Sequence, residues 1–192
     1  MKFSDNELMD LAKAWFAISL AFAIVRGGDI FSNYFLITFL KSGFTVGIGF
    51  LLHEMAHKLV AQNYGCWAEF RAFTPMLVLA VFFSFFGFVF AAPGAVMING
   101  YVTTQKNGKI SVAGPLMNLI LALLFLPASL SGLAFLKDVG QYGFFINSWL
   151  ALFNMIPVWE LDGAKVLRWN KLVYFGMLGI AFIFVFLLQG VL

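Results

Sequence analysis

The most chemically distinctive stretch of the chain is LLHEMAHKLV, residues 51–60, in which His53, Glu54 and His57 stand among apolar side chains. On an α-helix, residues four positions apart lie on one face, so both imidazoles can reach a single ion. Neutral imidazole is a good zinc ligand, and two of them leave room for a third ligand and a water. Ionisable groups within apolar spans are usually functional, which favours metal binding over a packing role.

The position of Glu54 indicates what such an ion would be used for. Directly after the first histidine, its carboxylate points beside the metal rather than at it. From there it can accept a proton from a water and later deliver that proton to a leaving amine. This H-E-x-x-H arrangement is the helical signature of zinc metalloproteases. We therefore predict one Zn²⁺ per chain, held by His53 and His57, with Glu54 as the general base.

A third protein ligand must come from another part of the chain. Asp162 stands out because it follows an apolar span in NMIPVWELDGAKV, residues 154–166. Pro157 ends or kinks the preceding helix, and Gly163 allows a tight turn just after the carboxylate. Asp162 could also serve only as a cap of a helix end, and Glu160 is the competing ligand. The residue pattern alone does not decide which of the two carboxylates is the third ligand.

Composition decides the class of protein that must position these groups. Of the 192 residues, 62% are hydrophobic and 11% are charged, whereas soluble domains are nearer 45–50% apolar and about 25% charged. We predict an all-α polytopic membrane protein in which residues 1–192 form a single membrane-embedded domain. The net charge of +3 is too small to indicate nucleic acid as a partner. The lone Cys66 excludes an internal disulfide.

Hydropathy along the chain predicts about five or six transmembrane helices. The helix that carries the histidines is placed at residues 42–63 and is stopped by Gly65. Residues 101–112 carry a β-hairpin signal, with a turn at Asn107-Gly108 between β-forming residues. The next span is expected to begin at Gly114-Pro115, because proline suits the first helical turn. The remaining spans are expected at residues 8–25, 114–135, 140–158 and 172–191.

Three motifs in this order resemble the site-2 protease family of intramembrane zinc metalloproteases. They are His53-Glu54-x-x-His57, Gly114-Pro115-Leu116-x-Asn118 and Asn154-x-x-Pro157-x-x-x-Leu161-Asp162-Gly163. The resemblance covers a catalytic core at about residues 42–166. It implies that Asp162 is the third zinc ligand, that Glu54 is the general base and that Asn154 positions substrate or stabilises the oxyanion. It departs from the common pattern at Ala56 and Ala164, where many members have glycine.

The resemblance also implies the partners, which are transmembrane protein substrates cut within the lipid bilayer, usually near its cytosolic side. A substrate helix must unwind before cleavage, and strands within residues 95–112 could pair with the extended segment. Asn118 is expected to contact substrate or to make an interhelical hydrogen bond. The alternatives are a zinc or other divalent-metal transporter and a catalytically inactive scaffold. The oligomeric state stays open.

The zinc ligands constrain the topology. With a cytosolic N-terminus, span 8–25 runs outward and helix 42–63 runs inward, so both histidines lie near the cytosolic side. Asp162 can join them only if residues 74–98 return to the side that they left. We therefore predict a re-entrant or shallow membrane-associated segment there, bending near Gly87 or Pro93-Gly94. The protein is then a multi-pass cell-membrane protein whose active site faces the cytosol, as the positive-inside bias expects.

Overall fold

The computed structural model describes residues 2–27, 30–89 and 93–188, and most of them are helical. The longest helix is continuous from Phe35 to Asn63 and comprises α2 (Phe35–Ser42), a π-helical turn at Gly43–Gly47 and α3 (Ile48–Asn63). The other elements are α1 (Asp5–Gly27), β1 (Trp67–Ala72), α4 (Thr74–Ser84), β2 (Gly94–Asn99), α5 (Thr104–Ser129), α6 (Ala134–Asn154), α7 (Asp162–Trp169) and α8 (Lys171–Ile183), which ends in a π-helical turn at Phe184–Leu188.

Among the described residues, four helices are long and apolar enough to cross a membrane. They are Asp5–Gly27, Phe35–Asn63, Thr104–Ser129 and Lys171–Leu188. The predicted span at residues 140–158 corresponds to α6, which is 21 residues long but does not reach the same hydropathy. The chain is therefore a helical membrane protein, whereas the expected count of five or six spans is not confirmed.

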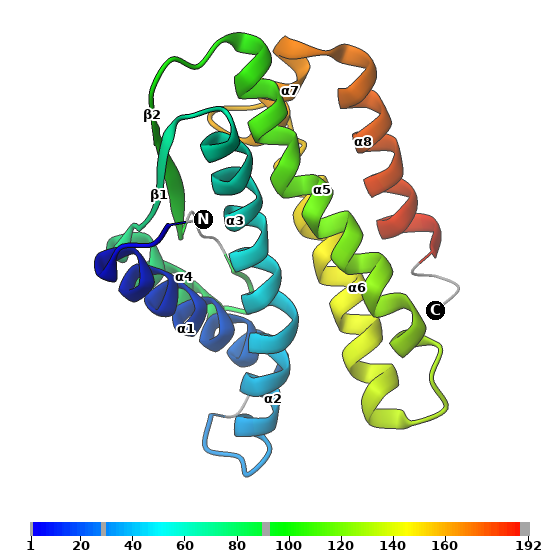
Figure 1. Cartoon of the computed structure of the whole chain (residues 1–192). Coiled ribbons are helices and arrows are strands. Elements are labelled where there is room, and N and C mark those ends of the chain that lie inside the picture. The colour runs from blue at the N-terminus through cyan, green and yellow to red at the C-terminus, as the bar shows by residue number, and fades with distance from the viewer. Residues whose placement is uncertain (1, 28–29, 90–92, 189–192) are drawn as a thin grey trace.

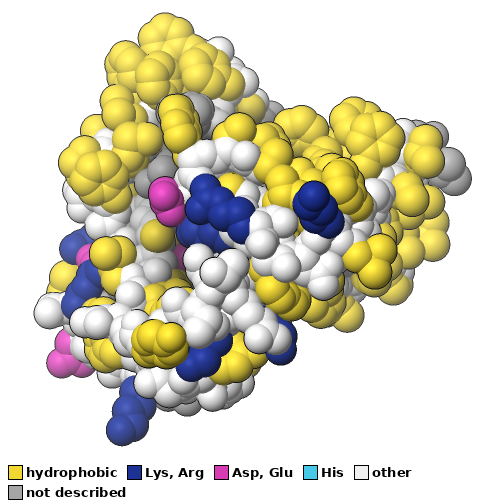
Figure 2. Space-filling model, turned by 90° about the horizontal axis from the view of Figure 1, so that it is seen from above, with side chains coloured by type: hydrophobic (Ala, Val, Ile, Leu, Met, Phe, Trp, Pro, Cys, Tyr) yellow, Lys and Arg dark blue, Asp and Glu magenta, His cyan; other side chains and the backbone are white. Residues whose placement is uncertain are grey.

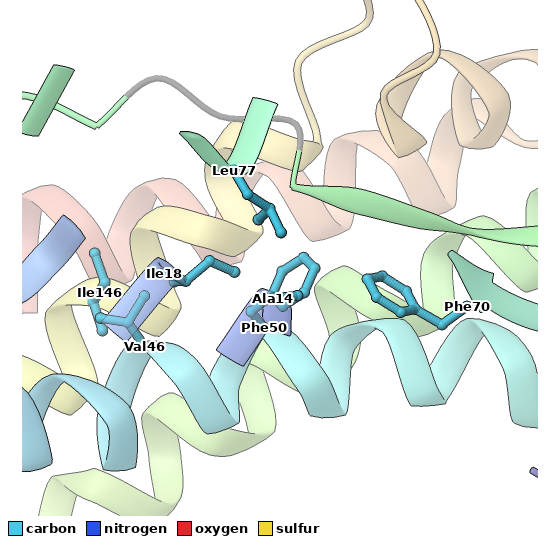
Figure 3. Packing of buried hydrophobic residues seen from close by; sticks show 7 residues of the cluster. All are labelled: Ala14, Ile18, Val46, Phe50, Phe70, Leu77 and Ile146. Atoms are coloured by element: carbon cyan, nitrogen blue, oxygen red, sulfur yellow. The ribbon is translucent and has the colours of Figure 1, made fainter. Parts of the chain in front are cut away.

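α3, α5, α6 and α8 run along the molecule (Figure 1). α1 and the two strands pack against the flank of the helix Phe35–Asn63, and α4 packs on α1. Figure 3 shows an apolar cluster, with side chains from α1, α3, β1, α4 and α6 pointing toward one another. Its members are Ala14, Ile18, Val46, Phe50, Phe70, Leu77 and Ile146.

The segment between the strands leaves the sheet and returns to it. β1 and β2 are antiparallel, with Trp67 opposite Asn99 and Ala72 opposite Gly94, and the Phe73 N–H donates to the Pro93 carbonyl at 3.0 Å. α4 has 11 residues, about 16 Å of helix, against an apolar bilayer core of about 30 Å. Such a helix is too short to cross the bilayer alone, and the chain returns to the strand that it left, whereas the predicted entry of this segment into the membrane stays a prediction. Residues 90–92 lie outside the described residues.

The hairpin prediction for residues 101–112 is wrong, because α5 already begins at Thr104. The Thr103 hydroxyl accepts a hydrogen bond from the Lys106 N–H at 3.3 Å and caps the helix. Gly108 lies within the helix, where a Cβ would come within 2.3 Å of Trp169 on α7, so the glycine serves close helix packing rather than a turn. The strand that does form, β2, ends before the predicted turn.

The predicted start of a span at Gly114-Pro115 is also wrong, because Pro115 lies inside α5. A proline there removes one backbone hydrogen bond of the helix but does not end it. The stop predicted for the histidine helix is confirmed. α3 ends at Asn63, and Gly65 follows with a φ of 76°, a left-handed conformation that glycine adopts without strain.

A buried ion pair fixes α1 and β1 to the histidine helix. Glu7 on α1 forms an ion pair with Lys58, the residue after His57, and both side chains are almost completely buried. The second Glu7 oxygen accepts the Phe70 N–H at 2.9 Å, so one carboxylate joins α1, α3 and β1. These residues hold β1 in place beside the helix that carries the histidines.

Candidate metal centre

Three side chains from distant parts of the chain converge at one point. His53 and His57 lie one turn apart on α3, and Asp162 is the first residue of α7. The two Nε2 atoms are 3.0 Å apart, and Asp162 Oδ2 lies 3.3 Å from Nε2 of His53 and 3.2 Å from Nε2 of His57. All three side chains are buried. Among the described residues, they form a group of ligand atoms placed to hold one metal ion.

The other ring nitrogens fix which atom of each imidazole faces this point. His57 Nδ1 lies 2.8 Å from the Ile110 carbonyl oxygen, which can only accept, so Nδ1 carries the proton. His53 Nδ1 lies 2.6 Å from Asn118 Oδ1, while the Asn118 amide donates to the Gly49 carbonyl at 3.3 Å. Two imidazole lone pairs and a carboxylate oxygen therefore face one another, and a cation stabilises such a group of acceptors.

Gly114 on α5 leaves room in front of the ligand atoms. A Cβ at this position would lie 2.4 Å from Nε2 of His57 and 2.5 Å from Nε2 of His53. Ligand atoms about 2.1 Å from a tetrahedral zinc ion are about 3.4 Å apart, close to the separations found here. The residues therefore fit zinc, with three protein groups and a fourth position for water.

The structure brings Asp162 and not Glu160 to the histidines. The Glu160 side chain is 95% exposed and pairs with Lys165 at 3.7 Å. Burial raises the pKa of the Asp162 carboxyl. The adjacent His57 and His53 imidazoles together lower this pKa by more than burial raises it, so the pKa lies below its usual value. Asp162 is therefore ionised at neutral pH, as a metal ligand must be.

Glu54 lies beside the ligands in a cavity of about 500 Å³. The cavity is lined by residues of α1, α3, β2, α5, α6 and the loop before α7. The Glu54 side chain is buried, and the backbone N–H of Val96 on β2 interacts with its carboxylate. A buried carboxylate next to three metal ligands and open to a cavity has the placement of a general base.

The outer edge of β2 lines the same cavity. On β1, the N–H groups of Phe70 and Ala72 point away from β2, because they donate to carboxylates of α1. Their partners in register are Val96 and Gly94, whose N–H groups also point away from the pair, since antiparallel residues alternate. Val96 and Gly94 line the cavity, so the outer edge of β2, which pairs with no further strand among the described residues, lies beside Glu54 and directs the Val96 N–H to it.

Two asparagines singled out in the sequence occupy different positions. Asn154 lines the cavity and donates to the Leu150 carbonyl of its own helix at 2.9 Å. Asn118 is completely buried on α5 and hydrogen-bonds to His53 and Gly49 on α3. This is the interhelical hydrogen bond, one of the two roles expected for Asn118 from the sequence. A substrate contact by Asn118 stays a prediction.

Sequence reasoning missed the groups that support the ligands. The Ile110 carbonyl orients His57, the Val96 N–H meets Glu54, and Asn147 donates and accepts hydrogen bonds behind Asn118. The first two are backbone groups, which no residue type reveals. Asn147 carried a usable signal, because an amide inside an apolar span needs a buried partner.

Two proteins of Methanocaldococcus jannaschii are similar to the chain. One, named "Putative zinc metalloprotease", is 41% identical over 182 residues, which cover 90% of the chain and 89% of that protein. The other, named "Zinc metalloprotease", is 26% identical over 127 residues, which cover 63% of the chain and 31% of that longer protein. No protein-family model and no solved structure matches the chain.

Proposed function

The chain belongs to the zinc metalloprotease family of these archaeal relatives, and we propose that it is an intramembrane protease of the site-2 protease type. Its substrates are membrane proteins, which it cuts within or near their transmembrane segments. One observation carries the proposal. The ligands His53 and His57 and the base Glu54 lie on Phe35–Asn63, a helix long and apolar enough to cross a membrane.

The chemistry follows from the residues around the cavity. A bound zinc supplies Lewis acidity, which lowers the pKa of a water ligand and polarises a carbonyl. Glu54 accepts the proton of the attacking water and delivers it to the leaving amine. Asn154 lines the same cavity and is the amide that we assign to orienting the substrate carbonyl or its oxyanion.

Support for an extended substrate comes from the outer edge of β2, which pairs with no further strand among the described residues. A peptide added to this edge would bond to the outward groups of Gly94 and to the Val96 carbonyl, and would pass in front of Glu54, which holds the Val96 N–H. The other edge of the sheet is less suitable, because Glu7 and Asp10 accept from both the Phe70 and the Ala72 N–H of β1. We assign β2 as the strand that pairs with an unwound transmembrane segment.

The proposed location is the cell membrane, with the active site toward the cytosol. Figure 2 looks onto the end of the molecule where α3, α5 and α7 meet, and dark-blue basic side chains are spread over this face. Lys106, Lys165 and Arg168 belong to elements at this end. An excess of basic residues is typical of cytosolic loops.

The test is co-expression with single-span reporter proteins. Glu54→Gln preserves shape and removes the base, so we expect it to retain about one zinc per chain and to lose reporter cleavage. Wild-type cleavage by this variant would contradict the assigned role. Zinc uptake into vesicles is measured on the same two proteins. Uptake without cleavage by the wild type would indicate a transporter, and neither activity would indicate a scaffold.

A further inference from the structure

Asn147 is a completely buried amide on α6, between α3 and α5, and it does not belong to the group of metal ligands. Its Nδ2 donates to the Gly143 carbonyl at 2.9 Å and lies 3.5 Å from the Thr45 carbonyl. Its Oδ1 accepts from Nδ2 of Asn118 at 3.0 Å. Both ends of the amide therefore have partners, which fixes its orientation.

The orientation of Asn147 supports that of Asn118, whose NH₂ group donates both to Asn147 and to the Gly49 carbonyl. Carbonyl oxygens can only accept, so the Gly143 carbonyl requires the NH₂ group of Asn147 and turns its Oδ1 toward Asn118. Asn118 must then present its own NH₂ group to Asn147 and its Oδ1 to His53. His53 consequently carries its proton on Nδ1 and keeps the Nε2 lone pair toward the other ligands.

Gly49 provides the space for this arrangement. It lies on α3, one turn before His53, and a Cβ there would come within 2.4 Å of Asn147 Oδ1. The Gly49 carbonyl also accepts from Asn118 at 3.3 Å. A methyl group at Gly49 would displace the Asn147 amide without removing it.

We propose that Asn147 is a positioning residue of the zinc site, which acts through Asn118 to set the tautomer and direction of His53. The direct outer partner of a metal-ligating histidine, here Asn118, usually contributes 10–100-fold to metal affinity, and Asn147 acts through it. The inference concerns zinc binding and not the substrate, so its failure would leave the proposed proteolysis untouched. This chain of hydrogen bonds also explains why the side chains of Asn147, Asn118 and His53 are buried between apolar helices.

The test measures zinc affinity of the folded apoprotein by chelator competition, together with the visible absorption of the cobalt-substituted protein. Asn147→Leu should bind zinc about 10–100-fold more weakly than the wild type and alter the cobalt spectrum. Ser148→Ala is the matched control, because Ser148 is the next residue, is equally buried and donates only to Phe144 of its own helix at 2.7 Å. It should bind zinc as the wild type does.

A further variant separates positioning from packing. Gly49→Ala, which keeps Asn147 but places a methyl group against its Oδ1, should weaken zinc binding. If Asn147→Leu lowers the unfolding temperature of the apoprotein but leaves zinc affinity and the cobalt spectrum unchanged, the residue only packs and the proposal is overturned. If Asn147→Leu fails to fold, wild-type zinc affinity of Gly49→Ala overturns it instead.

Discussion

At the scale of residues, the metal site depends on groups that are not themselves ligands. Each histidine has its Nδ1 held by an acceptor, the Ile110 carbonyl for His57 and the Asn118 amide for His53. Gly114 leaves the opposite side open by having no side chain. Three ligands can then face one another without rearranging when the ion binds.

Gly114→Ala therefore tests the space in front of the ligands. The new methyl group would overlap the Nε2 atoms of both histidines, so we expect zinc affinity to fall at least about tenfold with no change in the ligands themselves. Zinc per chain after dialysis against a weak chelator is the measurement. The control is Gly176→Ala on α8, where a Cβ would meet nothing within 4 Å. Equal loss in both variants, or in neither, would refute the steric explanation.

The residue pattern could predict the two histidine ligands but neither the third ligand nor the groups that support them. The spacing of His53 and His57 follows from helix geometry alone, and Glu54 follows from the motif. The pattern could not choose between Asp162 and Glu160, because the choice depends on which carboxylate the loop after α6 turns inward. Asn147 could not be assigned either, since its role depends on which helices surround it.

At the scale of elements, the N-terminal helix α1 holds strand β1 in place against α3. Glu7 joins Lys58 of α3 to the backbone of β1, and Asp10 accepts the Ala72 N–H at 3.3 Å. These carboxylates close the outer edge of β1. The outer edge of β2 faces the cavity instead, pairs with no further strand among the described residues and directs its Val96 N–H to Glu54.

The buried pair makes a prediction about stability. Lys58→Met leaves the Glu7 carboxylate buried without its cation, which should lower the free energy of unfolding by about 3–5 kcal/mol. The double variant Glu7→Gln/Lys58→Met should regain much of that loss, because no buried charge remains. Lys13→Met is the control, since Lys13 is half exposed in its pair with Asp10 and should change stability by less than about 1 kcal/mol. Denaturant titration in detergent measures all three, and equal effects of Lys58→Met and Lys13→Met would contradict the account.

The errors in element prediction have one cause. Asn107-Gly108 and Gly114-Pro115 are usually turn or helix-start signals, yet both lie within α5. Gly108 is required by the approach of Trp169 and Gly114 by the approach of the histidines. Tertiary packing thus overrode the local preference, and a single sequence does not show which neighbours will approach a glycine.

At the scale of the whole molecule, one end gathers the functional elements. The end of α3, both strands, the start of α5 and α7 meet there, and the turn between α5 and α6 lies at the other end (Figure 1). The return of the chain between β1 and β2 makes this possible, because it keeps α5 starting on the side where α3 ends.

Cysteine labelling tests the topology that follows. Cys66 is replaced by Ser, and single cysteines are placed at Lys106, near the start of α5, and at Lys137, near the start of α6. An impermeant thiol reagent on the extracytoplasmic face should label position 137 and spare position 106, with both labelled after permeabilisation. Extracytoplasmic labelling of position 106 would defeat the cytosolic placement of the active site.

The most direct measurement of the central claim is to map the cut that the purified protein makes. The wild type and Glu54→Gln, each loaded with zinc, are reconstituted into liposomes with a single-span substrate, and the products are identified by mass spectrometry. We predict a cut inside the apolar segment of the substrate by the wild type alone. Cuts confined to the water-exposed parts of the substrate, or an equal cut by Glu54→Gln, would contradict intramembrane proteolysis at this site.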